Sequence, residues 1–168
     1  MIDDALIGPA RDLLALCRRK GLTIATAESC TGGLVSALLT EIPGSSEVLD
    51  RGFVTYSNDA KQAMLSVPAM TLKTYGAVSR ETAEAMAAGA LAAAPVDLAV
   101  SITGIAGPDG GTPDKPVGLV HFAAASRSGR RVHQERRFGA LGRAQVRHAS
   151  VAVAFAMLHD LAVSETKT

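Results

Sequence analysis

The pattern that most constrains this fold is the direct succession of strand-like and helix-like segments in the first half of the chain. Residues 22–27 form a short β-compatible run, and the turn at residues 28–33 leads straight into apolar residues spaced as in a helix. Residues 51–57 repeat the arrangement, because this second strand-like run precedes a helix-like segment that contains Lys61. Strands that alternate with helices pair in parallel, since the helix carries the chain back to the same edge of the sheet.

The second half of the chain adds one more strand and a hairpin. Asp59 is expected to cap the short helix that carries Lys61, and Ser79 to begin a long alanine-rich helix. Ser128 and Gly129 join two strand-like runs in a predicted β-hairpin. The other expected elements are helices at 3–20, 79–94 and 143–163 and strands at 96–103, 117–125 and 131–138. The sequence therefore predicts an α/β fold, with residues 1–168 as one three-layer α/β/α domain around a mixed, largely parallel central sheet.

The charge balance excludes several classes of partner. The 17 Lys and Arg residues are nearly matched by 16 Asp and Glu residues, so the formal net charge of +1 favours neither nucleic acid nor a membrane surface. The arginines between residues 127 and 137 are interpreted as part of a solvated hairpin, with a local anion patch as the alternative. The N-terminal segment lacks the pattern of a secretory signal, and no segment is expected to be long enough to span a membrane. We therefore expect a cytoplasmic protein without a membrane partner.

Composition also argues against a disulfide or a metal. With 48% hydrophobic residues, a chain of 168 residues can bury a core without either. Cys17 and Cys30 are expected to be reduced thiols. No metal is expected, because the four histidines lack the spacing of metal ligands; they are His121, His133, His148 and His159.

We expect a catalytic or binding site at the carboxyl edge of the parallel strands, where helix N-termini converge. Ser29 and Cys30 stand at a strand-to-helix turn, and the glycines at 32 and 33 let a ligand or another backbone approach closely. Backbone N–H groups near Thr31 could stabilise an oxyanion, and Ser29 ranks above Cys30 as nucleophile because no histidine can be assigned to the thiol. The alternative is that Ser29 or Thr31 only caps the helix.

Two further segments are predicted to reach the same edge. Tyr56 ends a strand and Lys61 begins a helix, where burial and the positive end of the helix dipole would favour a neutral amine able to take a proton from a hydroxyl. The alternative is a half-buried core tyrosine and an exposed lysine. The glycine-rich loop at 104–116 could offer N–H groups to a phosphate, although a purely structural loop has the same composition.

These three segments and a fourth motif together resemble the CinA C-terminal family over residues 5–160. The matching segments occur in the family's order; they are Thr26-Ala27-Glu28-Ser29-Cys30-Thr31-Gly32-Gly33, Gly52-Phe53-Val54-Thr55-Tyr56-Ser57-Asn58 with Lys61, Tyr75-Gly76-Ala77-Val78-Ser79, and Thr103-Gly104-Ile105-Ala106-Gly107-Pro108-Asp109-Gly110-Gly111. The resemblance implies an α/β/α fold, a homodimer, and hydrolysis of nicotinamide mononucleotide to nicotinate mononucleotide and ammonia.

The resemblance also assigns roles to individual residues. It implies that Ser29 is the nucleophile and Lys61 its base, with Tyr56 and Thr103 relaying or positioning protons. Arg143 or Arg147 would bind the phosphate, and no cofactor would be needed. The implied substrate-binding positions are Cys30, Thr31, Gly32, Gly33, Gly104, Gly107, Arg143 and Arg147. A non-catalytic module that binds or senses pyridine nucleotides through the same loops is the alternative.

Overall fold

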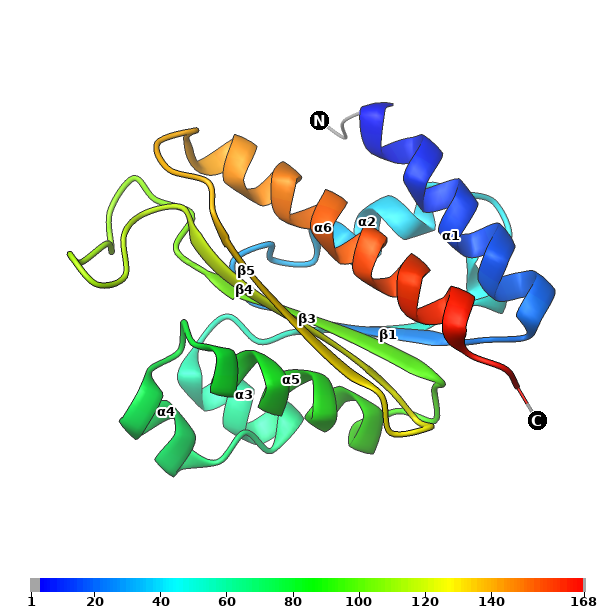
Figure 1. Ribbon diagram of the computed structural model, residues 1–168, viewed down its shortest axis with the longest axis horizontal. Helices are drawn as coiled ribbons and strands as arrows, with labels where there is room; N and C mark the ends of the chain where they lie inside the picture. The colour runs from blue at the N-terminus through cyan, green and yellow to red at the C-terminus, as the bar shows by residue number, and fades with distance from the viewer. Residues whose placement is uncertain (1–3, 168) are drawn as a thin grey trace.

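The computed structural model describes residues 4–167 and contains one five-stranded sheet between two layers of helices (Figure 1). The strands are β1 (Ile24–Glu28), β2 (Leu49–Val54), β3 (Leu98–Gly104), β4 (Leu119–Ser126) and β5 (Arg131–Arg137). The helices are η1 (Asp4–Leu6), α1 (Ile7–Lys20), α2 (Leu34–Thr40), η2 (Ser45–Glu47), α3 (Asn58–Leu65), α4 (Ala69–Tyr75), α5 (Arg80–Ala93) and α6 (Arg143–Ser164). The predicted three-layer α/β fold is confirmed.

The sheet has a parallel half and an antiparallel half, in the order β2-β1-β3-β4-β5. β1 pairs in parallel with both β2 and β3, and β4 runs antiparallel to both β3 and β5. Every residue of β1 and β4 is buried, whereas the edge strands β2 and β5 are mostly exposed. The parallel half places the carboxyl ends of β1, β2 and β3 side by side, as the sequence predicts.

The two helical layers differ in the size of the side chains that they pack against the sheet. α1, α2 and α6 cover one face, and α3, α4 and α5 cover the other (Figure 1). The first layer packs large side chains such as Leu13, Leu38 and Phe155. The second packs mainly alanines, and α5 comes so close to α3 that a Cβ on Gly89 would lie 2.0 Å from the Leu65 carbonyl oxygen. This tight packing fixes α3, the helix that carries Lys61.

The sequence-based boundaries need four corrections. α4 was not predicted, because its sequence includes two threonines and a tyrosine, which have modest helix propensity. β2 ends at Val54, so Tyr56 lies in the following loop and is 59% exposed rather than half-buried. Ser57, not Asp59, caps α3, because its side chain accepts a hydrogen bond from the Ala60 N–H at 3.0 Å. The first α-helix begins at Ile7, after a short 3-10 turn.

The expectation that no segment is long enough to span a membrane was wrong when helices are judged by length and composition alone. α6 has 22 residues and is apolar enough to pass that test. Half of its apolar window is buried inside the domain, however, where it packs against α1, β3 and β4. Such burial is typical of a core helix, so the observation is weak support for a membrane span.

Candidate active site

An open cleft of about 280 Å³ lies at the carboxyl edge of the parallel strands. Its floor comes from the segments that follow β1 and β2, one wall from the segment before α5, and the other wall from the loop after β3. The lining residues are Ser29, Cys30, Tyr56, Lys61, Ala77, Val78, Thr103, Gly104, Ile105, Ala106, Gly107, Asp109, Gly110 and Arg143. Eight of the sequence-predicted site residues therefore meet in one cleft.

The turn that carries Ser29 is held rigidly at its start. The Ser29 N–H donates to the Ile102 carbonyl at 2.9 Å, which extends the pairing between β1 and β3. The Glu28 carboxylate, fully buried, accepts hydrogen bonds from the N–H groups of Val35 at 2.9 Å and Ser36 at 3.1 Å. A carboxylate at this position satisfies free N–H groups of the first turn of α2 and complements the helix dipole. Glu28 thus ties the end of β1 to the start of α2.

Lys61 lies beneath Ser29 and is almost completely buried, with 1% of its surface exposed. Its Nζ lies 2.9 Å from Ser29 Oγ and 2.9 Å from the carbonyl oxygen of Thr55. The Thr55 N–H in turn donates to the Glu28 carbonyl oxygen at 2.8 Å. The backbone of Thr55 therefore contacts both Lys61 and the residue that precedes Ser29. Burial lowers the pKa of Lys61 from its ordinary value of 10.5, because desolvation disfavours the ammonium form.

This arrangement suits a serine nucleophile with a lysine base. A neutral amine has one lone pair, which can accept the Ser29 hydroxyl proton, and its N–H groups can donate to the Thr55 carbonyl. The position of the lysine is fixed by tertiary contacts rather than by sequence proximity, since 32 residues separate it from the serine. The interpretation of Lys61 as an exposed solubilising residue is wrong.

Cys30 lies beside the serine but is a poor nucleophile. Burial raises the pKa of its thiol to about 12, so the thiol is protonated at neutral pH. Cys17 and Cys30 are both free and buried, as expected. The structure therefore supports the ranking of Ser29 above Cys30.

Two predicted site residues meet at the mouth of the cleft. Arg143, at the start of α6, donates from Nη2 to the Tyr56 hydroxyl at 2.8 Å and from Nη1 to the Gly107 carbonyl at 2.9 Å. Both side chains line the cleft and both are exposed. Arg143 is thus a cation that an anionic group entering the cleft can reach.

Thr103 lies deeper and is 1% exposed. Its hydroxyl donates to the carbonyl oxygen of Ala77 at 2.7 Å, which connects β3 to the wall before α5. This contact engages its only proton, so the geometry favours a positioning role over a proton relay.

Four predicted substrate-binding residues lie behind the cleft rather than in its lining. Arg147 donates to the carbonyl oxygens of Cys30 at 3.2 Å and Thr31 at 3.1 Å, so it braces the turn from the α6 side. Gly32 and Gly33 have φ angles of +59° and +97°, a conformation that disfavours other residues. Thr31 is fully buried. These four residues shape the turn, and of the two arginines considered for the phosphate only Arg143 lines the cleft.

Some residues at the site were missed from the sequence. Glu28 gave a usable signal, since an acidic residue just before a predicted helix often caps it. Ala77 and Val78 belong to a motif that carries the family resemblance, but no role was assigned to them, because their position in the wall depends on α4, which was not predicted. Asp109 lines the cleft within the glycine-rich loop and is the one acidic residue among the described lining residues.

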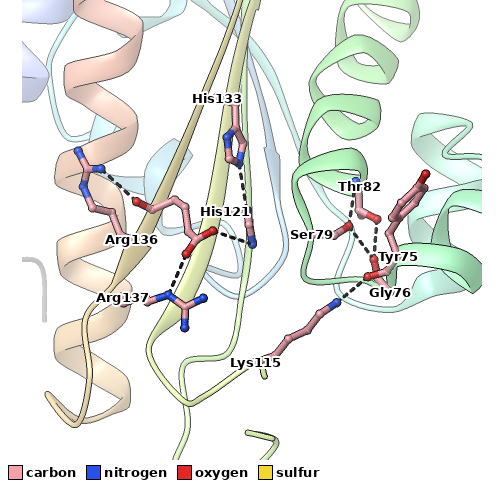
Figure 2. A network of polar contacts seen from close by, with 10 residues as sticks. Tyr75, Gly76, Ser79, Thr82, Lys115, His121, His133, Arg136 and Arg137 are labelled. Atoms are coloured by element: carbon pink, nitrogen blue, oxygen red, sulfur yellow. Dashed lines mark hydrogen bonds and ion pairs between the residues drawn. The ribbon is translucent and has the colours of Figure 1, made fainter. Parts of the chain in front are cut away.

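The histidines lie apart from the cleft. Across β4 and β5, His121 Nδ1 and His133 Nε2 lie 3.0 Å apart, a contact that their spacing did not predict (Figure 2). Within residues 4–167, no group of three or more His, Cys, Asp or Glu residues is arranged to hold a metal ion.

Comparison with known proteins places this geometry in a family. The model of the CinA C-terminal domain matches residues 8–162. The chain belongs to the CinA C-terminal domain family. The crystal structure of the competence/damage inducible protein CihA from Agrobacterium tumefaciens is similar to this CinA-family domain, with a TM-score of 0.94 and 52% identity over 96% of this chain and 98% of that one.

Curated relatives of this CinA-family domain differ in length and in name. A CinA-like protein of Syntrophotalea carbinolica is 56% identical over 82% of this chain and 33% of its own length, so the chain spans about a third of that relative. A protein of Enterobacter agglomerans named nicotinamide-nucleotide amidohydrolase PncC is 52% identical over 74% of this chain and 76% of its own length. The relatives therefore include both long CinA-like proteins and one of a length close to that of this chain.

Proposed function

We propose that this protein hydrolyses the carboxamide of nicotinamide mononucleotide, which yields nicotinate mononucleotide and ammonia. The observation that carries the proposal is the 2.9 Å contact between a buried lysine amine and a serine hydroxyl at the floor of a cleft. That pair suits acyl transfer, because a neutral amine can activate a serine without a metal. The name of the Enterobacter agglomerans relative supports this choice of amide.

In the proposed first half-reaction, Ser29 Oγ attacks the carboxamide carbon while Lys61 Nζ takes the hydroxyl proton. The tetrahedral intermediate collapses when Lys61 returns this proton to the amide nitrogen, so the C–N bond breaks and ammonia leaves. A nicotinoyl ester then remains on Ser29. Backbone N–H groups of the turn after Ser29 are the candidate donors to the oxyanion.

In the second half-reaction, water attacks the ester carbon and Lys61 accepts a proton from that water. The bond to Ser29 Oγ breaks, Lys61 returns the proton to the serine, and nicotinate mononucleotide is released. The sum is one amide and one water converted to one carboxylic acid and one ammonia. Tyr56 and Thr103 are assigned to positioning, since their hydroxyls bond to Arg143 and Ala77.

The substrate phosphate is assigned to the mouth of the cleft. Arg143 provides the positive charge, and the loop with Gly104 and Gly107 provides backbone groups nearby. Binding energy from the phosphate would orient the distant carboxamide over Ser29. Arg147 is assigned to the turn instead, because it does not line the cleft and its guanidinium bonds to two carbonyl oxygens of the turn.

The proposal includes a cytoplasmic homodimer that acts on a small nucleotide and binds neither nucleic acid nor membrane. The near-zero net charge supports the last two points. Sedimentation equilibrium of the purified protein tests the oligomeric state, and a mass of one chain would contradict the dimer.

The test of the proposed reaction is an ammonia assay on purified protein with nicotinamide mononucleotide, free nicotinamide and the dinucleotide as separate substrates. We expect ammonia from the mononucleotide. Ser29→Ala should abolish its release but retain nucleotide binding, whereas Ser164→Ala, at the far end of α6, should behave as wild type. Saturable binding without ammonia in the wild type would instead indicate a non-catalytic nucleotide-binding module.

A further inference from the structure

The segment 75–79 forms one wall of the cleft, and side chains from other elements hold its backbone in place. Ala77 and Val78 line the cleft directly. The Gly76 carbonyl accepts from Ser79 Oγ at 3.0 Å and from Thr82 Oγ1 at 2.7 Å, and the Ala77 carbonyl accepts from Thr103. The wall is thus anchored to α5 and to β3, and Figure 2 shows the contacts at Gly76.

The opposite wall belongs to the glycine-rich loop between β3 and β4. Beyond its lining residues the loop contains a tight turn, in which the Thr112 N–H donates to the Lys115 carbonyl at 2.8 Å and the Lys115 N–H donates to Thr112 Oγ1 at 3.0 Å. These two reciprocal bonds fix the backbone of Lys115. Its side chain therefore leaves the loop from a defined position.

Lys115 connects the two walls. Its Nζ donates to the Tyr75 carbonyl oxygen at 2.5 Å, at the C-terminal end of α4 (Figure 2). An ammonium group is favourable there, because the last carbonyl groups of a helix accept no hydrogen bond from within the helix and carry partial negative charge. Glycine at position 76 leaves room for this contact, because a Cβ there would lie 3.0 Å from Lys115 Nζ. The φ of +80° at Gly76 also disfavours other residues.

We propose that Lys115 is a positioning residue that sets the width of the substrate cleft by joining the glycine-rich loop to the wall at 75–79. The inference rests on the proposed function, because it concerns how the same cleft holds a nucleotide. Lys115 is not among the described residues that line the cleft, so it acts through the walls. Losing the contact frees the loop from the wall, while Ser29 and Lys61 keep their own contacts beneath.

The test compares Lys115→Met, which keeps the length but loses the charge and donor, with Lys115→Arg, which keeps both. For nicotinamide mononucleotide we expect Lys115→Met to raise KM about tenfold and to change kcat by less than about twofold. Lys115→Arg should recover most of the lost affinity. Lys73→Met is the matched control, because Lys73 is an exposed lysine on α4.

Hydrogen exchange of the substrate-free protein gives a readout that does not depend on catalysis. Lys115→Met should exchange faster than wild type at residues 75–79 and 105–118, with no change in β1. If the wild type releases no ammonia, the proposed function fails, but the exchange experiment still tests the contact.

Three outcomes would overturn the inference. They are a wild-type KM in Lys115→Met, a fall in kcat with KM unchanged, and unchanged exchange in both walls. An arginine variant as impaired as the methionine variant would also count against it.

Discussion

The floor and the mouth of the cleft are built in different ways. At the floor, Ser29 and Lys61 are buried and held by backbone bonds that continue the sheet or cap a helix. At the mouth, Tyr56 and Arg143 are exposed and contact one another through a single hydrogen bond. Under the proposed function, bond breaking falls in the buried region and nucleotide recognition in the exposed one.

The physical reason lies in the solvent. Burial removes hydration from the ammonium form of Lys61, lowers its pKa and so favours the neutral amine that can act as a base. A phosphate must enter from water, so its partner has to remain accessible. Variants at the two regions should therefore affect different kinetic constants.

The largest effect is expected from removing the base at the floor. Lys61→Met should lower kcat by about 10²–10⁴-fold, the usual contribution of a general base, with substrate binding retained. Lys61→Arg should be equally impaired, because a guanidinium stays protonated and cannot accept a proton. Stopped ammonia assays and calorimetric binding measure both quantities. A fully active arginine variant would exclude lysine as the base.

The pH dependence should separate the floor from the mouth in a second way. Since Lys61 acts when neutral, kcat/KM should fall about tenfold per pH unit below its lowered pKa. The unfolded chain binds this proton up to 10.5, so the free energy of unfolding should rise with pH between the folded pKa and 10.5. Urea unfolding at several pH values tests the slope, which Lys61→Met should remove. A kcat/KM independent of pH would contradict the neutral-amine mechanism.

A smaller change is expected at the mouth. Arg143→Ala should raise KM about tenfold or more and lower kcat less, because it removes a charged contact far from the reacting carbon. Steady-state kinetics on the mononucleotide and on its dephosphorylated riboside should show that the penalty disappears with the riboside. Equal penalties on both substrates would place the phosphate elsewhere.

The smallest effect is one of stability and belongs to the floor. Glu28→Gln should lower the free energy of unfolding by about 1–3 kcal/mol, because an amide replaces the buried carboxylate that accepts two N–H groups. Glu84→Gln is the control, since its ion pair with Arg80 is on the surface and should contribute less than about 1 kcal/mol. Both values come from urea unfolding at neutral pH. Equal losses would mean that Glu28 does not brace the turn.

The fold could be predicted from the sequence more fully than the site. Alternation of strand-like and helix-like segments sufficed for the layers and for the parallel half, because hydrophobic periodicity is a local signal. The topology predicted that the segments of Ser29 and Lys61 reach the same edge of the sheet, whereas their roles as nucleophile and base came from family resemblance, and the residues alone left each with a structural alternative. The short helix α4 was not predicted from the sequence, so the position of Ala77 and Val78 in the wall of the cleft could not be predicted.

The contact of Arg147 with the turn joins two segments that leave the ribosome at different times. This guanidinium reaches the carbonyl oxygens of Cys30 and Thr31 from the last helix, more than a hundred residues later in the chain. On the ribosome the strand that precedes Ser29 emerges long before residue 147. The nascent chain therefore lacks this brace until α6 docks, and before that the turn depends on the contacts of Ser29 with β3 and of Glu28 with α2.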